Sequence, residues 1–246
     1  MARSKGKWSK HTAMYMNPQL RPVLPHTELL NQKNFYRLLK MYRHIIVKPS
    51  NSSGGDGVIQ ITTIAPNQFK VHYEKKQKKV NLEQLYPLIR RLTPNSKATY
   101  IVQRRISLLK INGKPFDLRV MVQRKKGVGW LVTGIMAKVA GSGYFITNLV
   151  RSKGKALPYH TALRQCNRAK MLSPQLLEQQ IRWYALMAVK QLQKYYKIRT
   201  VGLDMGIDES GKLWIIEANF SPDKTYFKRL KDKTMYRRIM AIYNER

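Results

Sequence analysis

The segment 202–219, which reads GLDMGIDESGKLWIIEAN, constrains the fold of this chain more than any other. Apolar and polar residues alternate on both sides of a Ser210-Gly211 turn signal, and this pattern predicts a β-hairpin. If the turn centres on Ser210-Gly211, Asp204 lies directly opposite Glu217, and Asn219 shares their face. Carboxylate and amide oxygens are the ligands that Mg²⁺ prefers. The hairpin therefore predicts a magnesium site made by Asp204, Glu217 and Asn219.

The other face of this hairpin is apolar and is expected to pack as core. The alternation assigns to it Leu203, Met205, Ile207, Ile216 and Ala218. On the polar face, Gly202 and Gly206 flank Asp204 and leave space beside its carboxylate. An alternative interpretation stays open, in which the two carboxylates are simply paired with some of the many lysines of the chain.

The charge of the chain indicates an acidic partner. Its 246 residues include 47 Lys and Arg against 13 Asp and Glu, a formal net charge of +34. Nucleic acid, acidic proteins and anionic polymers all fit such a charge, but no helix-turn-helix, zinc-finger or aromatic RNA-binding motif is present. A solvated, highly soluble surface is the alternative.

Composition predicts a folded chain kept in the cytoplasm. Apolar residues make up 43% of it, which suits one compact unit or two small lobes. No apolar run is long enough to span a membrane, and the N-terminal residues lack the apolar core of a signal peptide. Cys166 is the single cysteine, so neither a disulfide within the chain nor a zinc site is expected.

Periodicity along the chain predicts a mixed α+β fold. Helices are expected over Thr27–Tyr42, with Thr27 as cap, over Leu82–Leu92, over Ser173–Lys197, where Ser173 and Pro174 begin the helix, and in the tail after Pro222. Strands are expected over Ile45–Lys48 and Val58–Thr62, and the basic segment Tyr73–Val80 is expected to span a hairpin turn. Three further runs are expected to form one antiparallel sheet: Tyr100–Val102, Asp117–Gln123 and Trp130–Lys138.

Lys48 ends a predicted strand six residues before Gly54-Gly55-Asp56-Gly57. Glycines allow backbone N–H groups to close on phosphate oxygens, and a nearby lysine adds a positive charge. This arrangement is typical of a phosphate site, although the spacing is not that of the P-loop GxxxxGK[ST]. A surface turn with an incidental lysine is the alternative interpretation.

A third group of polar residues lies in the middle of the chain. Asp117 and Arg119 share one strand face, and Lys138 ends the next strand, with Asn148 further along the chain. A carboxylate, a guanidinium and an ammonium in one place are expected to bind a phosphate together with a carboxylate substrate. Singly, each of these residues would be an ordinary surface charge.

The order of these three groups resembles the ATP-grasp superfamily, and most closely its YheC/YheD endospore coat-associated branch. The resemblance covers about residues 5–228. It is carried by Lys7-Trp8, Leu24-Pro25-His26-Thr27-Glu28, Val47-Lys48-Pro49, Phe116-Asp117-Leu118-Arg119, Thr147-Asn148 and Ile216-Glu217-Ala218-Asn219.

The resemblance implies a single α+β ATP-grasp domain in which two lobes grip ATP between them. Its expected parts are an N-terminal segment over about residues 1–27, a smaller nucleotide lobe over 28–99 and a larger lobe over 100–246. A full N-terminal pre-ATP-grasp domain is not expected, because only about 25 residues precede the first predicted helix.

The resemblance also implies roles for individual residues. The ATP phosphates would be bound by Lys7, Lys48, Gly54, Gly55 and Gly57, and the adenine would lie along Gln103, Arg104 and Ile106. The same nucleotide site would include Asp117 and Asn148, and Mg²⁺ would be held by Asp204, Glu217 and Asn219. The catalytic residues would be Arg119 and Lys138. Relatives often have a glutamate in the linking strand, where this chain reads Gln103-Arg104-Arg105.

The implied activity is ATP- and Mg²⁺-dependent joining of a carboxylate to an amine through an acyl phosphate. An acidic peptide, protein or other polyanion is the expected substrate or partner. Two alternatives remain, a nucleotide-binding structural protein associated with the spore coat and a nucleic-acid-binding module.

Overall fold

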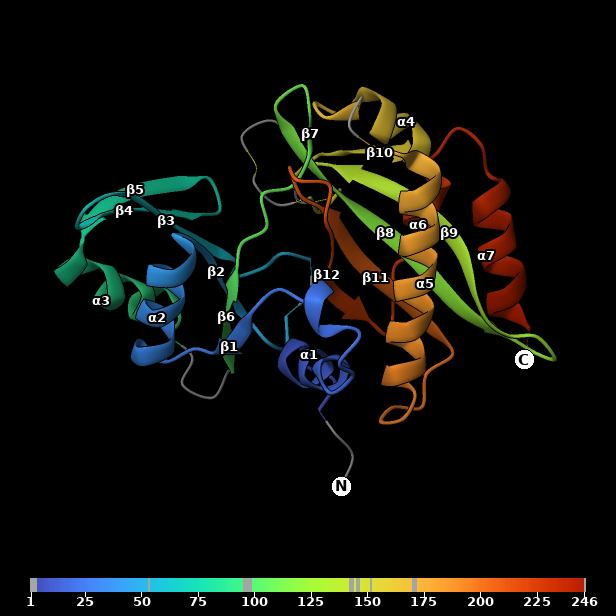
Figure 1. Ribbon diagram of the computed structural model, residues 1–246, viewed down its shortest axis with the longest axis horizontal. Helices are drawn as coiled ribbons and strands as arrows, with labels where there is room; N and C mark the ends of the chain where they lie inside the picture. Colours follow the sequence, from blue (N-terminus) through green and yellow to red (C-terminus); the bar gives the residue numbers. More distant parts are fainter. Residues whose placement is uncertain are drawn as a thin grey trace. The chain divides into compact units, whose positions relative to one another are not determined.

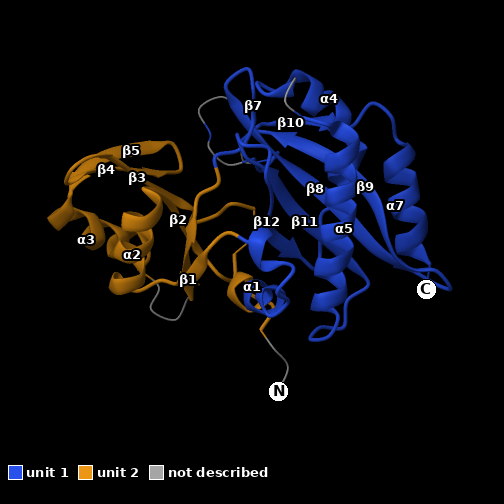
Figure 2. Cartoon of the chain, viewed as in Figure 1, with its two compact units in different colours: residues 1–3, 10–24, 107–246 blue, residues 4–9, 25–106 orange. Residues whose placement is uncertain are grey.

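The computed structural model describes residues 4–52, 54–94, 99–141, 144, 147–150, 152–169 and 172–245. The chain divides into two compact units, which Figure 2 distinguishes by colour. Unit 1 comprises residues 1–3, 10–24 and 107–246, and unit 2 comprises residues 4–9 and 25–106. Helix α1 (Lys7–Tyr15) begins in unit 2 and continues in unit 1.

Unit 2 is an antiparallel sheet with two helices on one face (Figure 1). Its strands are β1 (Thr27–Leu29), β2 (His44–Pro49), β3 (Ile59–Ala65), β4 (Gln68–Tyr73), β5 (Lys76–Asn81) and β6 (Tyr100–Arg104), in the spatial order β1-β6-β2-β3-β4-β5. Helices α2 (Gln32–Tyr42) and α3 (Leu82–Leu92) contribute Phe35, Leu38, Leu85 and Ile89 to a core that also contains Ile45, Val47, Ile61 and Val71 of the sheet. Since side chains alternate along a strand, Lys48 and Gln103 lie on the opposite, helix-free face.

Strand β5 lies at the edge of this sheet and carries the basic segment of the sequence. Five of its six side chains are exposed, and Val80 alone is buried. Lys76, Lys78 and Lys79 are among the exposed residues, and Lys79 lies opposite Lys70 of β4. The hairpin turn expected between Tyr73 and Val80 is confirmed.

Unit 1 contains the larger core, built around a second antiparallel sheet with helices on both faces (Figure 1). Its strands are β7 (Lys110–Ile111), β8 (Lys114–Lys125), β9 (Gly129–Val139), β10 (Lys155–Pro158), β11 (Thr200–Ile207) and β12 (Leu213–Asn219), in the order β10-β9-β8-β11-β12, with β7 paired to β8. Its further helices are η1 (Arg21–Val23), α4 (Tyr159–Gln165), α5 (Pro174–Leu192), α6 (Thr225–Lys228) and α7 (Thr234–Asn244).

The two faces of the unit 1 sheet are covered by different helices. On one face α5 packs Leu177, Ile181 and Ala185 against alternate residues of β8 and β11. On the other, Phe227 and Ile239 pack with Met121 and Met136. Gly134 permits this second contact, because a Cβ atom there would lie 2.6 Å from the Phe227 ring.

Local signals predicted the start of α5 better than its end. The Ser173 hydroxyl accepts a hydrogen bond from the Leu176 N–H and Pro174 occupies the first turn, as expected, but the helix ends at Leu192 instead of Lys197. Helix Leu82–Leu92 is also confirmed, with Asn81 and Gln84 forming a capping box. No helix in the described part of the chain combines the length and apolar character that a membrane crossing requires.

Two predictions of secondary structure were wrong. Thr27 does not cap a helix: it lies in β1, opposite Gln103, and the helix begins at Gln32 with the Asn31 side chain accepting from the Asn34 N–H at 2.8 Å. The Tyr100–Val102 run belongs to β6, which pairs with β1 and β2 in unit 2 instead of joining the sheet of unit 1. Both errors arise because the partner of a strand is set by tertiary pairing, which periodicity does not report.

Candidate functional site

The predicted hairpin is present in unit 1, and Asp204 of β11 lies opposite Glu217 of β12 as expected. The turn centre and the pairing register of the hairpin differ from those expected. Ile207 pairs with Leu213, which centres the turn on Ser210, and a register shift between Asp204 and Met205 then adds one residue to β12. This β-bulge brings the two carboxylate residues opposite each other.

Asp208 fixes the turn of this hairpin. Its Oδ1 accepts hydrogen bonds from the N–H groups of Ser210 at 2.9 Å and Lys212 at 3.0 Å, and its Oδ2 accepts from the Trp214 indole at 2.8 Å. Burial would raise the pKa of the Asp208 carboxyl, but the hydrogen bond from the Ser210 hydroxyl, together with those from the Trp214 indole and the two N–H groups, lowers it below its ordinary value. The turn therefore favours the ionised side chain and holds both strands in register.

The same bulge makes one core prediction wrong. Ile216 was expected in the core, yet Ile215 is the buried residue that packs there, and Ile216 is only half-buried. A Cβ atom on Gly206 would lie 3.1 Å from Ile216 Cδ1. Because the extra residue of β12 reverses the alternation, Ile216 places an apolar side chain beside Gly206 of β11.

Asp204 is the centre of an ion network on three neighbouring strands. Lys138 Nζ lies 2.7 Å from Asp204 Oδ1. Arg119 approaches both oxygens, with Nε 3.1 Å from Oδ1 and Nη2 3.4 Å from Oδ2. The Asn219 amide donates to Oδ2 at 3.1 Å. The hairpin residues Asp204 and Asn219 therefore lie in contact with the mid-chain residues Arg119 and Lys138. In the sequence these were two separate groups.

Asp117 is buried beneath this network. Its carboxylate lies 3.3 Å from Lys138 Nζ and accepts a 2.5 Å hydrogen bond from the Thr147 hydroxyl. Burial raises the pKa of Asp117, and the neighbouring ammonium only partly offsets this. Burial likewise acts to lower the pKa of Lys138, but Asp117 and Asp204 outweigh it and raise that pKa. Lys138 is therefore held as a cation between two carboxyl groups.

The Arg119 guanidinium does not use all of its hydrogen-bond donors within the described residues. Its Nη1 atom is buried and has no hydrogen-bond partner among the described residues. A Cβ atom on Gly202 would lie 2.6 Å from this Nη1 and 2.5 Å from Pro222 Cβ, so only glycine leaves room here. The Tyr226 ring lies 5.6 Å from the guanidinium carbon and its hydroxyl accepts from Asn148 Nδ2 at 3.4 Å. A buried guanidinium N–H of this kind can donate a hydrogen bond to an anion.

In unit 2, a chain of hydrogen bonds holds the Lys48 ammonium in place. Its buried Nζ donates to Gln103 Oε1 at 2.9 Å, Gln103 Nε2 donates to the Thr27 hydroxyl at 2.8 Å, and that hydroxyl donates to the Pro25 carbonyl at 2.8 Å. These bonds fix the ammonium on the helix-free face of the sheet. Arg104, from the same strand as Gln103, lies over the Tyr42 ring at 5.1 Å, and Ile106 is half-buried.

The glycine loop of unit 2 is brought together with Lys7. Gly54, Gly55 and Gly57 all have positive φ, at 70°, 80° and 65°. The Lys7 ammonium donates to the Ser52 carbonyl, and the Lys7 N–H donates to the Ser50 carbonyl at 2.8 Å. The start of α1 is therefore attached to the loop.

The chain matches the profile of the family described as YheC/D-like ATP-grasp over residues 2–244. It belongs to this family.

Known proteins similar to this YheC/D-like ATP-grasp chain agree with that assignment. The endospore coat-associated protein YheD of Bacillus subtilis strain 168 is 26% identical over 230 residues, which are 90% of this chain and 49% of YheD. The chain thus spans about half the length of this curated relative.

Solved structures support the ATP-grasp fold. The ATP-grasp ligase PsnB, complexed with minimal precursor, Mg and ADP, matches with a TM-score of 0.51 and 14% identity, over 94% of this chain and 56% of PsnB. The ADP complex of purK, N5-carboxyaminoimidazole ribonucleotide synthetase, matches with a TM-score of 0.58 and 13% identity, over 98% of this chain and 52% of that one. The expected α+β ATP-grasp fold is confirmed.

The residues of this YheC/D-like ATP-grasp chain fit Mg²⁺. The described residues contain no cluster of three or more His, Cys, Asp or Glu side chains able to hold a metal ion. Mg²⁺ needs fewer, since it is usually held by one or two carboxylates together with water and substrate phosphates. Asp204 and Glu217 offer two carboxylates on one face, and Asn219 adds an amide that already contacts Asp204.

Three residues of the network were missed in the sequence. Gly202 was noted only for the space it leaves, Thr147 only as part of a two-residue motif, and Tyr226 not at all. A hydroxyl bonded to a buried carboxylate and a ring over a guanidinium depend on segments distant in sequence, so no local pattern reports them.

Proposed function

We propose that this chain is an ATP- and Mg²⁺-dependent carboxylate–amine ligase. The observation that carries the proposal is the ion network of unit 1, where Arg119 and Lys138 contact Asp204 and the buried Nη1 of Arg119 has no hydrogen-bond partner among the described residues. An ATP-grasp fold supplies the context, because the family suggests ligase-type activity that uses ATP. The network fits a reaction in which negative charge moves between phosphate and carboxylate oxygens.

Each unit by itself contains proposed nucleotide contacts. Lys7, Lys48 and the glycine loop 54–57 would contact its phosphates, because cations and N–H groups beside positive-φ glycines suit phosphate oxygens. Gln103, Arg104 and Ile106 of unit 2 would line the adenine. In unit 1, Asp117 and Asn148 are the proposed nucleotide contacts. When bound by Asp204, Glu217 and Asn219, Mg²⁺ would neutralise phosphate charge.

The chemistry would proceed in two balanced steps. A substrate carboxylate oxygen attacks the γ-phosphorus of ATP, the bond from that phosphorus to the bridging oxygen breaks, and ADP leaves with an acyl phosphate formed. An amine then attacks the acyl carbon, a C–N bond forms, and the C–O bond to phosphate breaks. The amine loses a proton to solvent or phosphate. Arg119 and Lys138 would donate hydrogen bonds to the oxygens that gain charge in both steps.

The substrate is proposed to be an acidic peptide or polymer. The support is the formal charge of +34, which far exceeds what a single ATP requires. PsnB, which shares the fold, is described in complex with a minimal precursor and with a precursor peptide. A polypeptide substrate would therefore be compatible with this fold.

The test is acceptor-dependent ADP release. The protein is incubated with ATP, Mg²⁺ and acidic peptides carrying a free amine, ADP is measured, and the products are examined by intact mass for loss of one water per bond formed. Arg119→Ala is expected to lower turnover more than ATP affinity, because its role is greatest when charge develops. Arg124→Ala is the matched control, as it removes an exposed arginine from the same strand. Equal effects of the two variants would contradict the role given to Arg119.

A second candidate is a coat-associated structural protein that binds nucleotide without turnover. The observation that favours it is the similarity to the endospore coat-associated YheD. Magnesium-dependent ATP binding without ADP release for any acidic acceptor would support this candidate over the ligase.

A further inference from the structure

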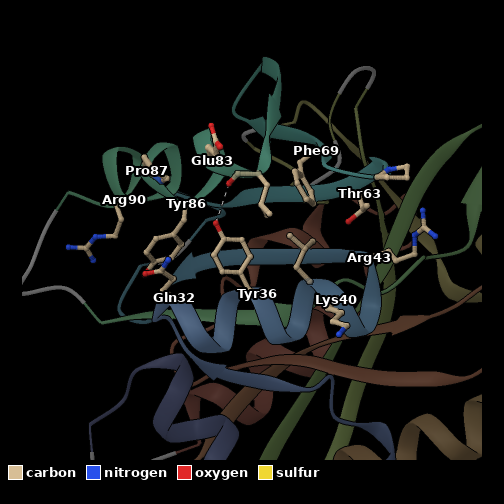
Figure 3. A pocket seen from close by; sticks show the side chains of 13 residues that line it. Gln32, Tyr36, Lys40, Arg43, Thr63, Phe69, Glu83, Tyr86, Pro87 and Arg90 are labelled. Atoms are coloured by element: carbon tan, nitrogen blue, oxygen red, sulfur yellow. Dashed lines mark hydrogen bonds between the residues drawn. The ribbon is translucent and has the colours of Figure 1, made fainter.

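A hollow in unit 2 is lined by none of the residues proposed above to contact nucleotide or metal. It is an open groove of about 1100 Å³ on the helix-covered side of the sheet. Its walls come from α2 and α3 and its floor from β3 and β4 (Figure 3). Lys48 and Gln103 lie on the other face of this sheet, and none of the proposed nucleotide contacts lines the groove.

The middle of the groove is apolar and aromatic. Tyr36 and Tyr86 lie with their ring centroids 6.0 Å apart, and Leu39 and Phe69 contribute further apolar surface. Leu82 also lines the groove and is 42% exposed, which is high for a leucine next to a core. The Tyr36 hydroxyl donates to the Leu82 carbonyl at 3.4 Å, and this hydrogen bond connects α2 to the start of α3. An exposed apolar surface of this kind typically marks a site of interaction with another molecule.

The rim of the groove is basic. Lys40, Arg43 and Arg90 line it, against one acidic side chain, Glu83. Figure 3 shows Arg90 at one end of the groove and Arg43 at the other, with the tyrosines toward the Arg90 end. The groove thus has an apolar centre and a cation at each end.

We propose that this groove binds an acidic polypeptide segment whose apolar residues lie on one side, an amphipathic helix flanked by Asp or Glu. A groove between two helices accepts apolar side chains spaced three and four residues apart, as in other helix-in-groove complexes. Its open form and large volume suit a chain segment better than an enclosed small molecule. The acidic flanks complement the basic rim.

This inference does not depend on catalysis, so it is tested without ATP. The probe is a fluorescent synthetic peptide of about 15 residues, with Leu or Phe at three- and four-residue spacing and Glu elsewhere. Its affinity is measured by fluorescence anisotropy. A scrambled peptide of the same composition, which has no apolar side, is the first control. We expect the helical peptide to bind at least about tenfold more tightly than the scrambled one.

Two matched double variants separate the groove from general attraction between charges. Lys40→Glu/Arg90→Glu reverses two cations of the rim and is expected to weaken binding about tenfold or more. Lys33→Glu/Arg91→Glu makes the same change in net charge at exposed positions of the same helices that do not line the groove. This control is expected to change the affinity by less than about threefold.

A third variant tests the apolar centre without changing charge. Thr63 lies among the groove residues and is half-buried, so Thr63→Trp would fill part of the space. It is expected to weaken binding while the circular dichroism spectrum and thermal unfolding stay close to those of the wild type. Equal affinity for helical and scrambled peptides, equal losses in the two double variants, or no binding at about 1 mM peptide would each overturn the proposal.

Discussion

Replacing Lys138 with methionine would test the buried ion network of unit 1 directly. The Lys138 side chain is only 5% exposed and its Nζ lies 2.7 Å from Asp204 and 3.3 Å from Asp117. Methionine keeps much of the volume but removes the charge, which leaves the buried Asp117 and the partly buried Asp204 with Arg119 as the remaining cation. Breaking a buried ion pair from one side costs about 3–5 kcal/mol, and we expect a loss of this size in the free energy of unfolding at pH 8.

The loss should depend on pH in a defined direction. Burial already raises the pKa of Asp117, and removing the ammonium that lowers it raises this pKa further. The folded variant then binds a proton more tightly than the unfolded chain, whose Asp pKa is about 3.9. Its stability therefore increases as the pH falls through the folded pKa, and the difference from the wild type should be smaller at pH 5 than at pH 8.

Urea unfolding followed by tryptophan fluorescence provides the measurement. Trp130, Trp183 and Trp214 lie in unit 1, so the signal reports mainly the unit that contains the network. Lys155→Met is the control, because Lys155 is an exposed lysine of the neighbouring strand β10.

A second variant isolates the charge imbalance. Lys138→Met/Asp117→Asn removes one charge of each sign and is expected to recover much of the lost stability, because the Arg119–Asp204 pair stays intact. A loss below about 1 kcal/mol in Lys138→Met, with no dependence on pH, would refute the reasoning, since it would mean that the network is solvated.

Three further variants test other parts of the molecule. Gly202→Ala should cost about 1–3 kcal/mol in urea unfolding, because its Cβ atom would lie within 2.6 Å of both Pro222 and Arg119; an unchanged midpoint would contradict this packing. Lys48→Ala should weaken ATP binding by about 1–3 kcal/mol in calorimetry, the scale of a lost charge-assisted hydrogen bond, while adenosine binding stays the same. Asp208→Ala should destabilise the protein at pH 7, and the difference from the wild type should shrink as the pH falls below about 4. The stability that comes from the lowered folded pKa of Asp208 is fully present above the unfolded pKa and is lost as the pH falls through the folded pKa. A difference that stays constant down to acid pH would argue against the turn hydrogen bonds.

The sequence was sufficient for the hairpin of unit 1 but not for its details. The pairing of Asp204 with Glu217 was predicted from a turn on Ser210-Gly211, and it is found although the turn is centred one half-residue earlier. The bulge that compensates also exchanges the roles of Ile215 and Ile216. Bulges carry no sequence signal in a run such as Trp214-Ile215-Ile216, where every residue can face either side.

Long-range pairing limited the predictions elsewhere. The strand beginning at Tyr100 was recognised, but its place between β1 and β2 depends on residues more than 50 positions away. Thr27 suits a helix cap by residue type, and its pairing with Gln103 overrides that preference. The groove between α2 and α3 could not be predicted, since it depends on how two separately recognised helices pack on one sheet.

The edge strand β5 has a consequence for how copies of the protein meet. An edge strand offers unpaired N–H and C=O groups to any other extended chain, and such edges lead to aggregation unless they are protected. Here Lys76, Lys78 and Lys79 face solvent along the edge, so two copies approaching edge to edge would bring two rows of ammonium groups together. Salt weakens this repulsion. Self-association through β5 should therefore rise with ionic strength, whereas attraction to an acidic partner falls, and the lysines would keep the protein monomeric in the low-salt conditions where it binds that partner best.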